Sequence, residues 1–102
     1  EWVESELLSQ AGILQAAVFG EAQAFLVAVI FAPTLSVREL QCAVEQANQA
    51  LPDYAQVKKF FCTNEAFTLI NGLATSNGRN KREAIAEYFQ TAIDQLYLAE
   101  DL

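Results

Sequence analysis

The chain of 102 residues contains no histidine, only two cysteines and only two prolines. Without histidine, the Ser–His and Cys–His pairs that activate nucleophiles in many enzymes cannot form within this chain. Cys42 and Cys62 are isolated and match no zinc-binding spacing, so no metal site is predicted. We interpret them as reduced thiols in the core of a cytosolic protein, with a disulfide between them as the alternative.

Positive charge is also scarce, because six Lys and Arg residues face thirteen Asp and Glu residues and the formal net charge is -7. Binding a nucleic-acid backbone requires a broad basic face, so no nucleic-acid partner is expected. No apolar run approaches the ~18–20 residues that span a membrane. The chain does not begin with the charged and apolar segments of a secretory signal. We therefore expect a cytoplasmic location and no membrane span.

Apolar residues, by contrast, are abundant enough for one folded domain over residues 1–102, since they make up 53% of the chain. Hydrophobic periodicity and turn residues predict helices and strands in alternation. Helices are expected over 2–10, 36–51 and 81–98, and strands over 13–19, 25–31 and 58–62. This order predicts an α+β fold with a small, mostly antiparallel three-stranded sheet and packed helices.

Local signals fix several element boundaries in this prediction. Ser36 and Glu39 form a capping-box pattern at the start of the second helix, and Pro52 follows its end. Asn80 and Glu83 indicate a similar N-cap pair for the last helix. The strand over 25–31 is continuously apolar, which indicates burial on both faces of the sheet.

The segment 71–82, N-G-L-A-T-S-N-G-R-N-K-R, holds half of the six cations, namely Arg79, Lys81 and Arg82. Its Asn-Gly pairs at 71–72 and 77–78 favour tight turns with positive φ. A cationic loop on an otherwise acidic domain is suited to reach an anionic group outside the domain.

This loop resembles the lysine loop near the C-terminus of adenylate-forming enzymes, the AMP-producing acyl-CoA synthetases and their relatives. The family pattern there is L-T-P-x-G-K, two apolar residues and an arginine, and it aligns with residues 74–82 of this chain. Other segments resemble the C-terminal lid domain of that family in the same order. They are E-W-V-E-S-E-L-L at the start, A-G-I-L-Q-A-A-V-F-G-E over 11–21, N-Q-A-L-P-D-Y over 48–54 and E-A-F-T-L-I-N-G-L-A-T over 65–75. The last of these is similar to a form common in long-chain acyl-CoA synthetases.

Three of the departures from this pattern bear on the chemistry of the loop. Arg79 stands where the family has its catalytic lysine, Ser76 replaces a usual proline, and Asn80 replaces a usual apolar residue. An arginine keeps the positive charge but presents it on a planar fork instead of a compact ammonium group.

The resemblance implies that the chain is the C-terminal lid of an ATP-dependent, AMP-forming acyl-activating ligase of fatty acid metabolism. The parent enzyme would use ATP, coenzyme A and Mg²⁺, and the lid would close over the N-terminal adenylation domain of the same chain. The isolated domain is expected to be inactive and to hold no cofactor. The acyl substrate, the acceptor (coenzyme A or a carrier-protein thiol) and the oligomeric state are left open.

The same resemblance points to five site residues. Arg79 is the expected catalytic cation, with Lys81 as the alternative, and Gly78 would let the backbone approach the nucleotide. Lys58 and Lys59 would meet the phosphates of coenzyme A, or else serve as edge-strand charges. The alternative function is a free-standing α+β interaction or small-ligand-binding module without catalysis, which the composition fits equally well.

Overall fold

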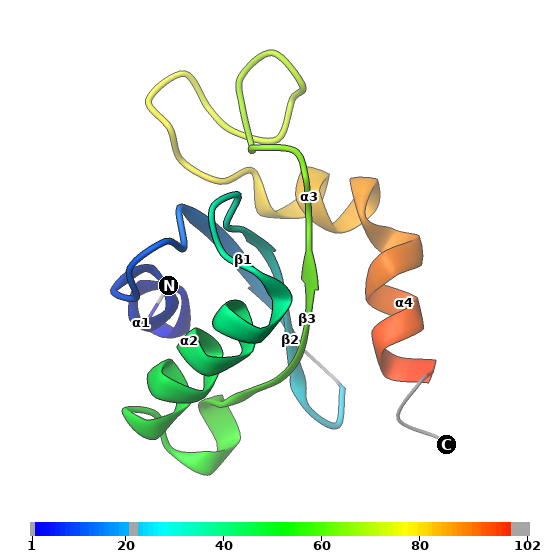
Figure 1. The fold of residues 1–102 in the computed structure, drawn as a ribbon. Helices are drawn as coiled ribbons and strands as arrows, with labels where there is room; N and C mark the ends of the chain where they lie inside the picture. The colour runs from blue at the N-terminus through cyan, green and yellow to red at the C-terminus, as the bar shows by residue number, and fades with distance from the viewer. Residues whose placement is uncertain (1, 21–22, 99–102) are drawn as a thin grey trace.

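The computed structural model describes residues 2–20 and 23–98, which form an α+β fold with one sheet (Figure 1). The helices and strands within these ranges are α1 (Trp2–Leu8), β1 (Gln15–Phe19), β2 (Leu26–Phe31), α2 (Val37–Gln49), the short 3-10 helix η1 (Asp53–Ala55), β3 (Val57–Cys62), α3 (Arg82–Tyr88) and α4 (Gln90–Leu98). The predicted fold class, with three strands and packed helices, is confirmed.

The sheet has the order β1-β2-β3 and is mixed. β1 pairs with β2 in antiparallel fashion, as the sequence predicted, because only residues 20–25 separate the two strands. β2 pairs with β3 in parallel fashion. The chain between them passes through α2, and such a crossover returns it to the same end of the sheet. One of the two strand pairs is therefore parallel in a sheet that was expected to be mostly antiparallel.

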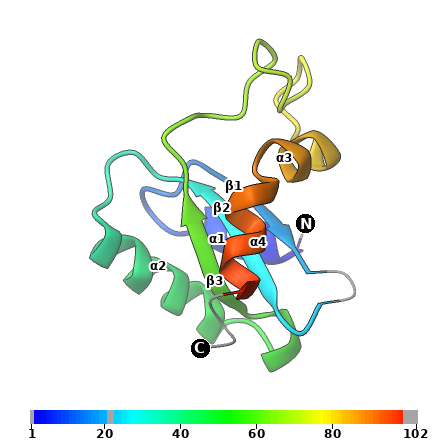
Figure 2. The same cartoon turned by 90° about the vertical axis from the view of Figure 1, so that its right-hand side faces the viewer.

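Helices cover both faces of the sheet, and β2 is the buried central strand (Figure 2). On one face, Ala28 and Ile30 pack against α1 and α2. On the other, Val27 and Val29 pack against α3, α4 and the segment that follows β3. The prediction that this strand is buried on both faces is confirmed.

The capping box of α2 forms as predicted. The Ser36 hydroxyl accepts a hydrogen bond from the backbone N–H of Glu39 at 3.1 Å, and the Glu39 carboxylate accepts one from the Ser36 N–H at 2.8 Å. Two backbone donors at the start of the helix are thereby satisfied.

The predicted single helix over 81–98 is wrong, because the chain breaks at Phe89 into α3 and α4. The Phe89 side chain is buried against the rings of Phe61 and Phe67. The break lets α3 lie against β1 while α4 crosses β2 and β3. The expected N-cap role of Asn80 is also wrong: Lys81 holds the cap position, and it makes no side-chain capping bond.

Cys42 and Cys62 are both exposed free thiols, so their predicted place in the core is wrong. Cys42 lies on the outward face of α2, and Cys62 ends the edge strand β3. Among the described helices, none is both long and apolar enough to cross a membrane.

Candidate functional site

The predicted cationic loop is a small hairpin, here called the cationic hairpin, over residues 74–80. Ala74 and Asn80 form an antiparallel bridge at its base, and the Thr75 N–H donates to the Arg79 carbonyl at 2.8 Å. The turn is closed by a 3.0 Å bond from the Gly78 N–H to the Thr75 carbonyl, and Gly78 has a φ of 84°. The predicted Asn77-Gly78 turn with positive φ is confirmed.

The Thr75 hydroxyl braces the inside of this hairpin. It accepts a hydrogen bond from the Arg79 N–H at 3.0 Å and donates one to Asn77 Oδ1 at 2.7 Å. The backbone of Arg79 is therefore held through both its N–H and its carbonyl. Its side chain is exposed, and within residues 2–20 and 23–98 no group bonds the guanidinium. A positive charge is thus presented to solvent from a fixed piece of backbone.

A second loop, between β3 and the cationic hairpin, presents an apolar surface that the sequence analysis missed. Leu69 is 62% exposed and Ile70 is 98% exposed; we call this pair the apolar tip. The Asn71 side chain braces the loop, since its Oδ1 accepts from the N–H groups of Thr68 and Leu73. Figures 1 and 2 show both loops projecting from the same end of the molecule. In the sequence, two large apolar residues directly before an Asn-Gly turn could have indicated this exposed surface.

The base of the cationic hairpin is attached to the free edge of β1. The Asn80 side-chain amide donates to the Ala16 carbonyl at 2.9 Å, and Arg82 Nη2 donates to the Val18 carbonyl at 2.9 Å. The Arg82 guanidinium also lies 4.8 Å from the centre of the Phe19 ring. Arg82 therefore contacts this strand through both a backbone carbonyl and an aromatic ring.

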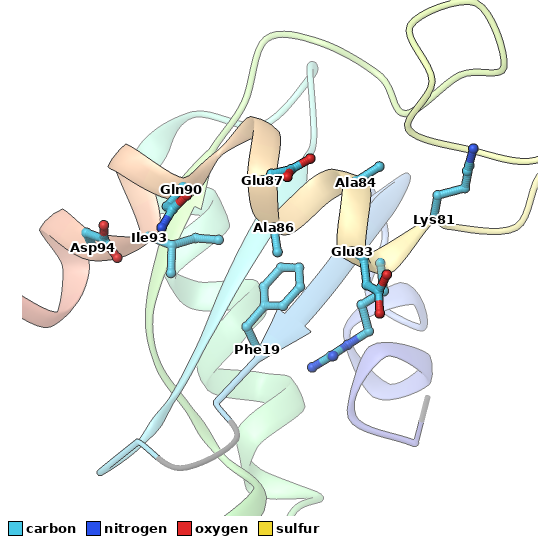
Figure 3. Close-up of a pocket in the computed structure, with 10 residues that line it drawn as sticks. Phe19, Lys81, Glu83, Ala84, Ala86, Glu87, Gln90, Ile93 and Asp94 are labelled. Atoms are coloured by element: carbon cyan, nitrogen blue, oxygen red, sulfur yellow. The ribbon is translucent and has the colours of Figure 1, made fainter.

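Lys81, the alternative cation, is exposed and lies directly before α3. It borders an open groove of about 870 Å³ that runs along α3 and the start of α4. Figure 3 shows Phe19 beneath Ala86 on the floor of this groove, while the Lys81 side chain extends away from it. The groove is also lined by acidic side chains, namely Glu83, Glu87 and Asp94. An anionic ligand in this groove would therefore meet three carboxylates.

Lys58 and Lys59 lie at the start of β3, whereas both loops follow the end of that strand. The structure therefore does not bring them together with Arg79. Lys58 is exposed, and the Lys59 ammonium lies 6.0 Å from the centre of the Phe25 ring. Both border a separate groove between α2 and β3.

Titratable groups outside the loops offer little further chemistry. The exposed Tyr88 hydroxyl donates to the Glu65 carboxylate at 2.8 Å, and this hydrogen bond, with the nearby negative charge, raises the Tyr88 pKa above its ordinary 10.0. In the described part of the chain, no group of three acidic, cysteine or histidine side chains could hold a metal ion. The described residues thus do not fit a Mg²⁺ site.

The chain matches a protein-family model along almost its whole length. The family model described as the AMP-binding enzyme C-terminal domain matches residues 2–101. Among curated proteins, the chain is similar to long-chain-fatty-acid–CoA ligase 5 of Mus musculus, with 45% identity over 47 residues. That match covers 46% of this chain and 7% of the mouse protein.

Solved structures share the fold as well. The adenylation domain of a carboxylate reductase from Mycobacterium chelonae has a TM-score of 0.82 and 19% identity, covering 94% of this chain and 17% of that one. The A domain of a carboxylic acid reductase from Segniliparus rugosus, in complex with AMP and a co-purified carboxylic acid, has a TM-score of 0.83 and 18% identity. That match covers 96% of this chain and 18% of the other. The chain therefore spans less than a fifth of the length of each of these three proteins.

Proposed function

The chain belongs to the AMP-binding enzyme C-terminal domain family, and from this premise we propose that residues 1–102 are the lid of a larger ATP-dependent, AMP-forming acyl-activating enzyme. The enzyme would be of the acyl-CoA synthetase type, acting with an N-terminal adenylation domain of the same chain. The lid would close over the active site of that domain and supply the cationic hairpin for adenylation.

The observation that carries this proposal is the Arg79 guanidinium, which has no bonded partner among residues 2–20 and 23–98 and extends from a braced hairpin. In adenylation, a carboxylate oxygen of the acid attacks the α-phosphorus of ATP, and the bond from that phosphorus to the pyrophosphate oxygen breaks. Negative charge on the phosphate oxygens is redistributed as this happens, and a preplaced cation stabilises it. A guanidinium can grip two oxygens of a phosphate or carboxylate at once.

Two neighbouring features support the proposal that this end of the molecule meets the adenylation domain. Gly78 has no side chain to keep the hairpin backbone away from a nucleotide. Ile70, at 98% exposure, makes almost no contact within the domain, and its apolar surface would leave water if this end docked. We propose that the apolar tip packs on the adenylation domain while Arg79 enters its active site.

The other site residues have more limited roles in the proposal. Lys81 is the alternative cation if the hairpin changes shape on docking. Lys58 and Lys59, at the far end of β3, would contact the phosphates of coenzyme A in a second pose, when its thiol attacks the acyl-adenylate. Mg²⁺ would arrive with ATP and be held by the adenylation domain, since this domain offers no carboxylate cluster for it among its described residues. The isolated domain is expected to be inactive.

The test compares two half-reactions in the full-length enzyme. Arg79→Ala should slow acid-dependent pyrophosphate exchange by about 10²–10³-fold, the usual effect of removing one group that stabilises transition-state charge. Transfer of the acyl group from a preformed adenylate to the thiol should change much less. Arg38→Ala is the matched control, because Arg38 is an exposed arginine on α2 with no side-chain hydrogen bond among the described residues, and it should leave pyrophosphate exchange within about threefold. Lys81→Ala tests the alternative cation, and a larger loss than that of Arg79→Ala would assign the catalytic role to Lys81.

Two outcomes would count against this assignment. Equal loss in both half-reactions after Arg79→Ala would indicate general damage instead of a role in adenylation. No loss in either would favour the non-catalytic interaction module, which requires no cation at this position.

A further inference from the structure

We infer that Asn80 is a positioning residue for Arg79, because it fixes the base of the cationic hairpin to the edge of β1. The inference rests on the proposed function of Arg79. The new point is that the Arg79 guanidinium extends from backbone anchored at the next residue, Asn80, and not from a freely moving loop.

The first support is the way in which the free edge of β1 is covered. An edge strand presents unpaired N–H and C=O groups that must be satisfied or shielded. Here side chains from three segments satisfy them: Asn80 bonds the Ala16 carbonyl, Arg82 bonds the Val18 carbonyl, and the Glu4 carboxylate accepts from the Val18 N–H at 2.8 Å. We call this set of contacts the edge clamp. It joins the cationic hairpin, α3 and α1 to one strand.

The second support is the place of Asn80 within the hairpin. It pairs with Ala74 at the base, and the next residue, Lys81, donates its N–H to the Leu73 carbonyl at 2.9 Å. The two arms are thus tied to each other directly beside the bond from Asn80 to β1. Arg79 is the last residue before this anchor, so its backbone can move little without breaking the clamp.

Asn80 is the most informative member of the clamp to change. Among the described residues, its side chain makes one hydrogen bond, to a backbone carbonyl, and it does not cap α3. Arg82, by contrast, belongs to α3 and also stacks on Phe19, so its removal would disturb the helix as well. Loss of the Asn80 amide should therefore free the hairpin while leaving the body of the domain intact.

The experiment uses the full-length enzyme with Asn80→Ala and Asn80→Asp, the latter keeping the size of the side chain but replacing the NH₂ donor with oxygen. Asn64→Ala is the matched control, because Asn64 is exposed in the same connecting segment and makes no side-chain hydrogen bond among the described residues. Amide hydrogen exchange over residues 73–81 reports the clamp without reference to activity. Steady-state adenylation kinetics and acyl transfer from a preformed adenylate report its effect on Arg79.

Both Asn80 variants should exchange about three- to tenfold faster over residues 73–81, as expected for loss of one hydrogen bond. The kcat of adenylation should fall by about tenfold or more, since a displacement of about 1 Å in a positioning group can cost on the order of 10²-fold. The KM for ATP should stay within about twofold, because an interaction used only in the transition state alters kcat and not ground-state binding. Acyl transfer and all properties of Asn64→Ala should be unchanged.

Unchanged exchange in both Asn80 variants would overturn the inference, because the hairpin would then be fixed without the clamp. Faster exchange with unchanged adenylation, in an enzyme that Arg79→Ala does inactivate, would also overturn it. Equal loss of adenylation and acyl transfer would show a structural role only. If Arg79→Ala is itself harmless, the proposed function fails and the positioning role fails with it, while the exchange measurement still decides whether the clamp holds the hairpin.

Discussion

Replacing Arg82 with alanine should destabilise the isolated domain, whereas the same change at Arg79 should leave its stability unaltered. Both are exposed arginines, three residues apart, at the same end of the molecule. Within the described part of the chain, Arg82 contacts the body of the domain through a hydrogen bond to Val18 and a ring contact with Phe19, whereas no group bonds the Arg79 guanidinium. The pair therefore separates a side chain used for folding from one available for function.

The expected size of the effect follows from these contacts. A hydrogen bond with a charged partner contributes about 1.5–3 kcal/mol, and partial exposure of Arg82 favours the lower end of that range. A cation over an aromatic ring at an exposed site adds about 0.5–1 kcal/mol. Arg82→Ala should thus lower the free energy of unfolding by about 2 kcal/mol, or the Tm by roughly 8–15 °C for a domain of this size. Arg79→Ala should stay within about 0.5 kcal/mol, as is usual for a surface side chain without contacts.

The assay is urea denaturation of the 102-residue domain followed by circular dichroism, which gives both the midpoint and its slope. Arg82→Lys keeps the charge but not the planar fork, so it should recover only part of the loss. A similar shift for Arg79→Ala and Arg82→Ala, or no shift for Arg82→Ala, would refute the description of the edge clamp.

Two further predictions concern other parts of the domain. The Tyr88 pKa lies above 10.0, so the bond to Glu65 stabilises the fold below that pH and is lost as pH rises through the raised pKa. An ultraviolet titration of the phenolate, assigned with Tyr88→Phe, should show the midpoint fall after Glu65→Gln, and an unmoved midpoint would contradict this cause. Ile70→Asp should leave the urea midpoint of the isolated domain unchanged yet slow adenylation in the full-length enzyme. By comparison, truncation of the fully buried Ile85 to alanine should lower the free energy of unfolding by about 2–5 kcal/mol. A stability loss at Ile70 equal to that at Ile85, or normal adenylation by Ile70→Asp, would count against docking of the apolar tip.

Features encoded by neighbouring residues could be predicted from the sequence. The capping box at Ser36 and the turn at Gly78 each depend on residues within a few positions of one another. The continuous apolar pattern of β2 likewise reported its burial on both faces. The exposure of Arg79 followed from its place in a polar turn, although its catalytic role is still a prediction.

Features that depend on distant contacts could not be predicted. The parallel pairing of β3 is decided by the path of the crossover through α2, which leaves no mark on the residues of β3 itself. The break at Phe89 depends on a cluster of rings from three segments. Asn80 fits a helix N-cap locally, but a carbonyl on β1 takes its side chain instead. In each case tertiary packing overrides a correct local preference.

The edge clamp also has a consequence for the synthesis of the protein. The bonds from Asn80 and Arg82 each span 64 positions of sequence. At roughly 5–20 residues per second, a ribosome needs about 3–13 s to synthesise that stretch. During this interval the carbonyls of Ala16 and Val18 have emerged without the side chains that later cover them, and an uncovered strand edge is a template for association between nascent chains. The edge of β1 in the nascent domain therefore remains open to such association until residues 80–82 have left the exit tunnel.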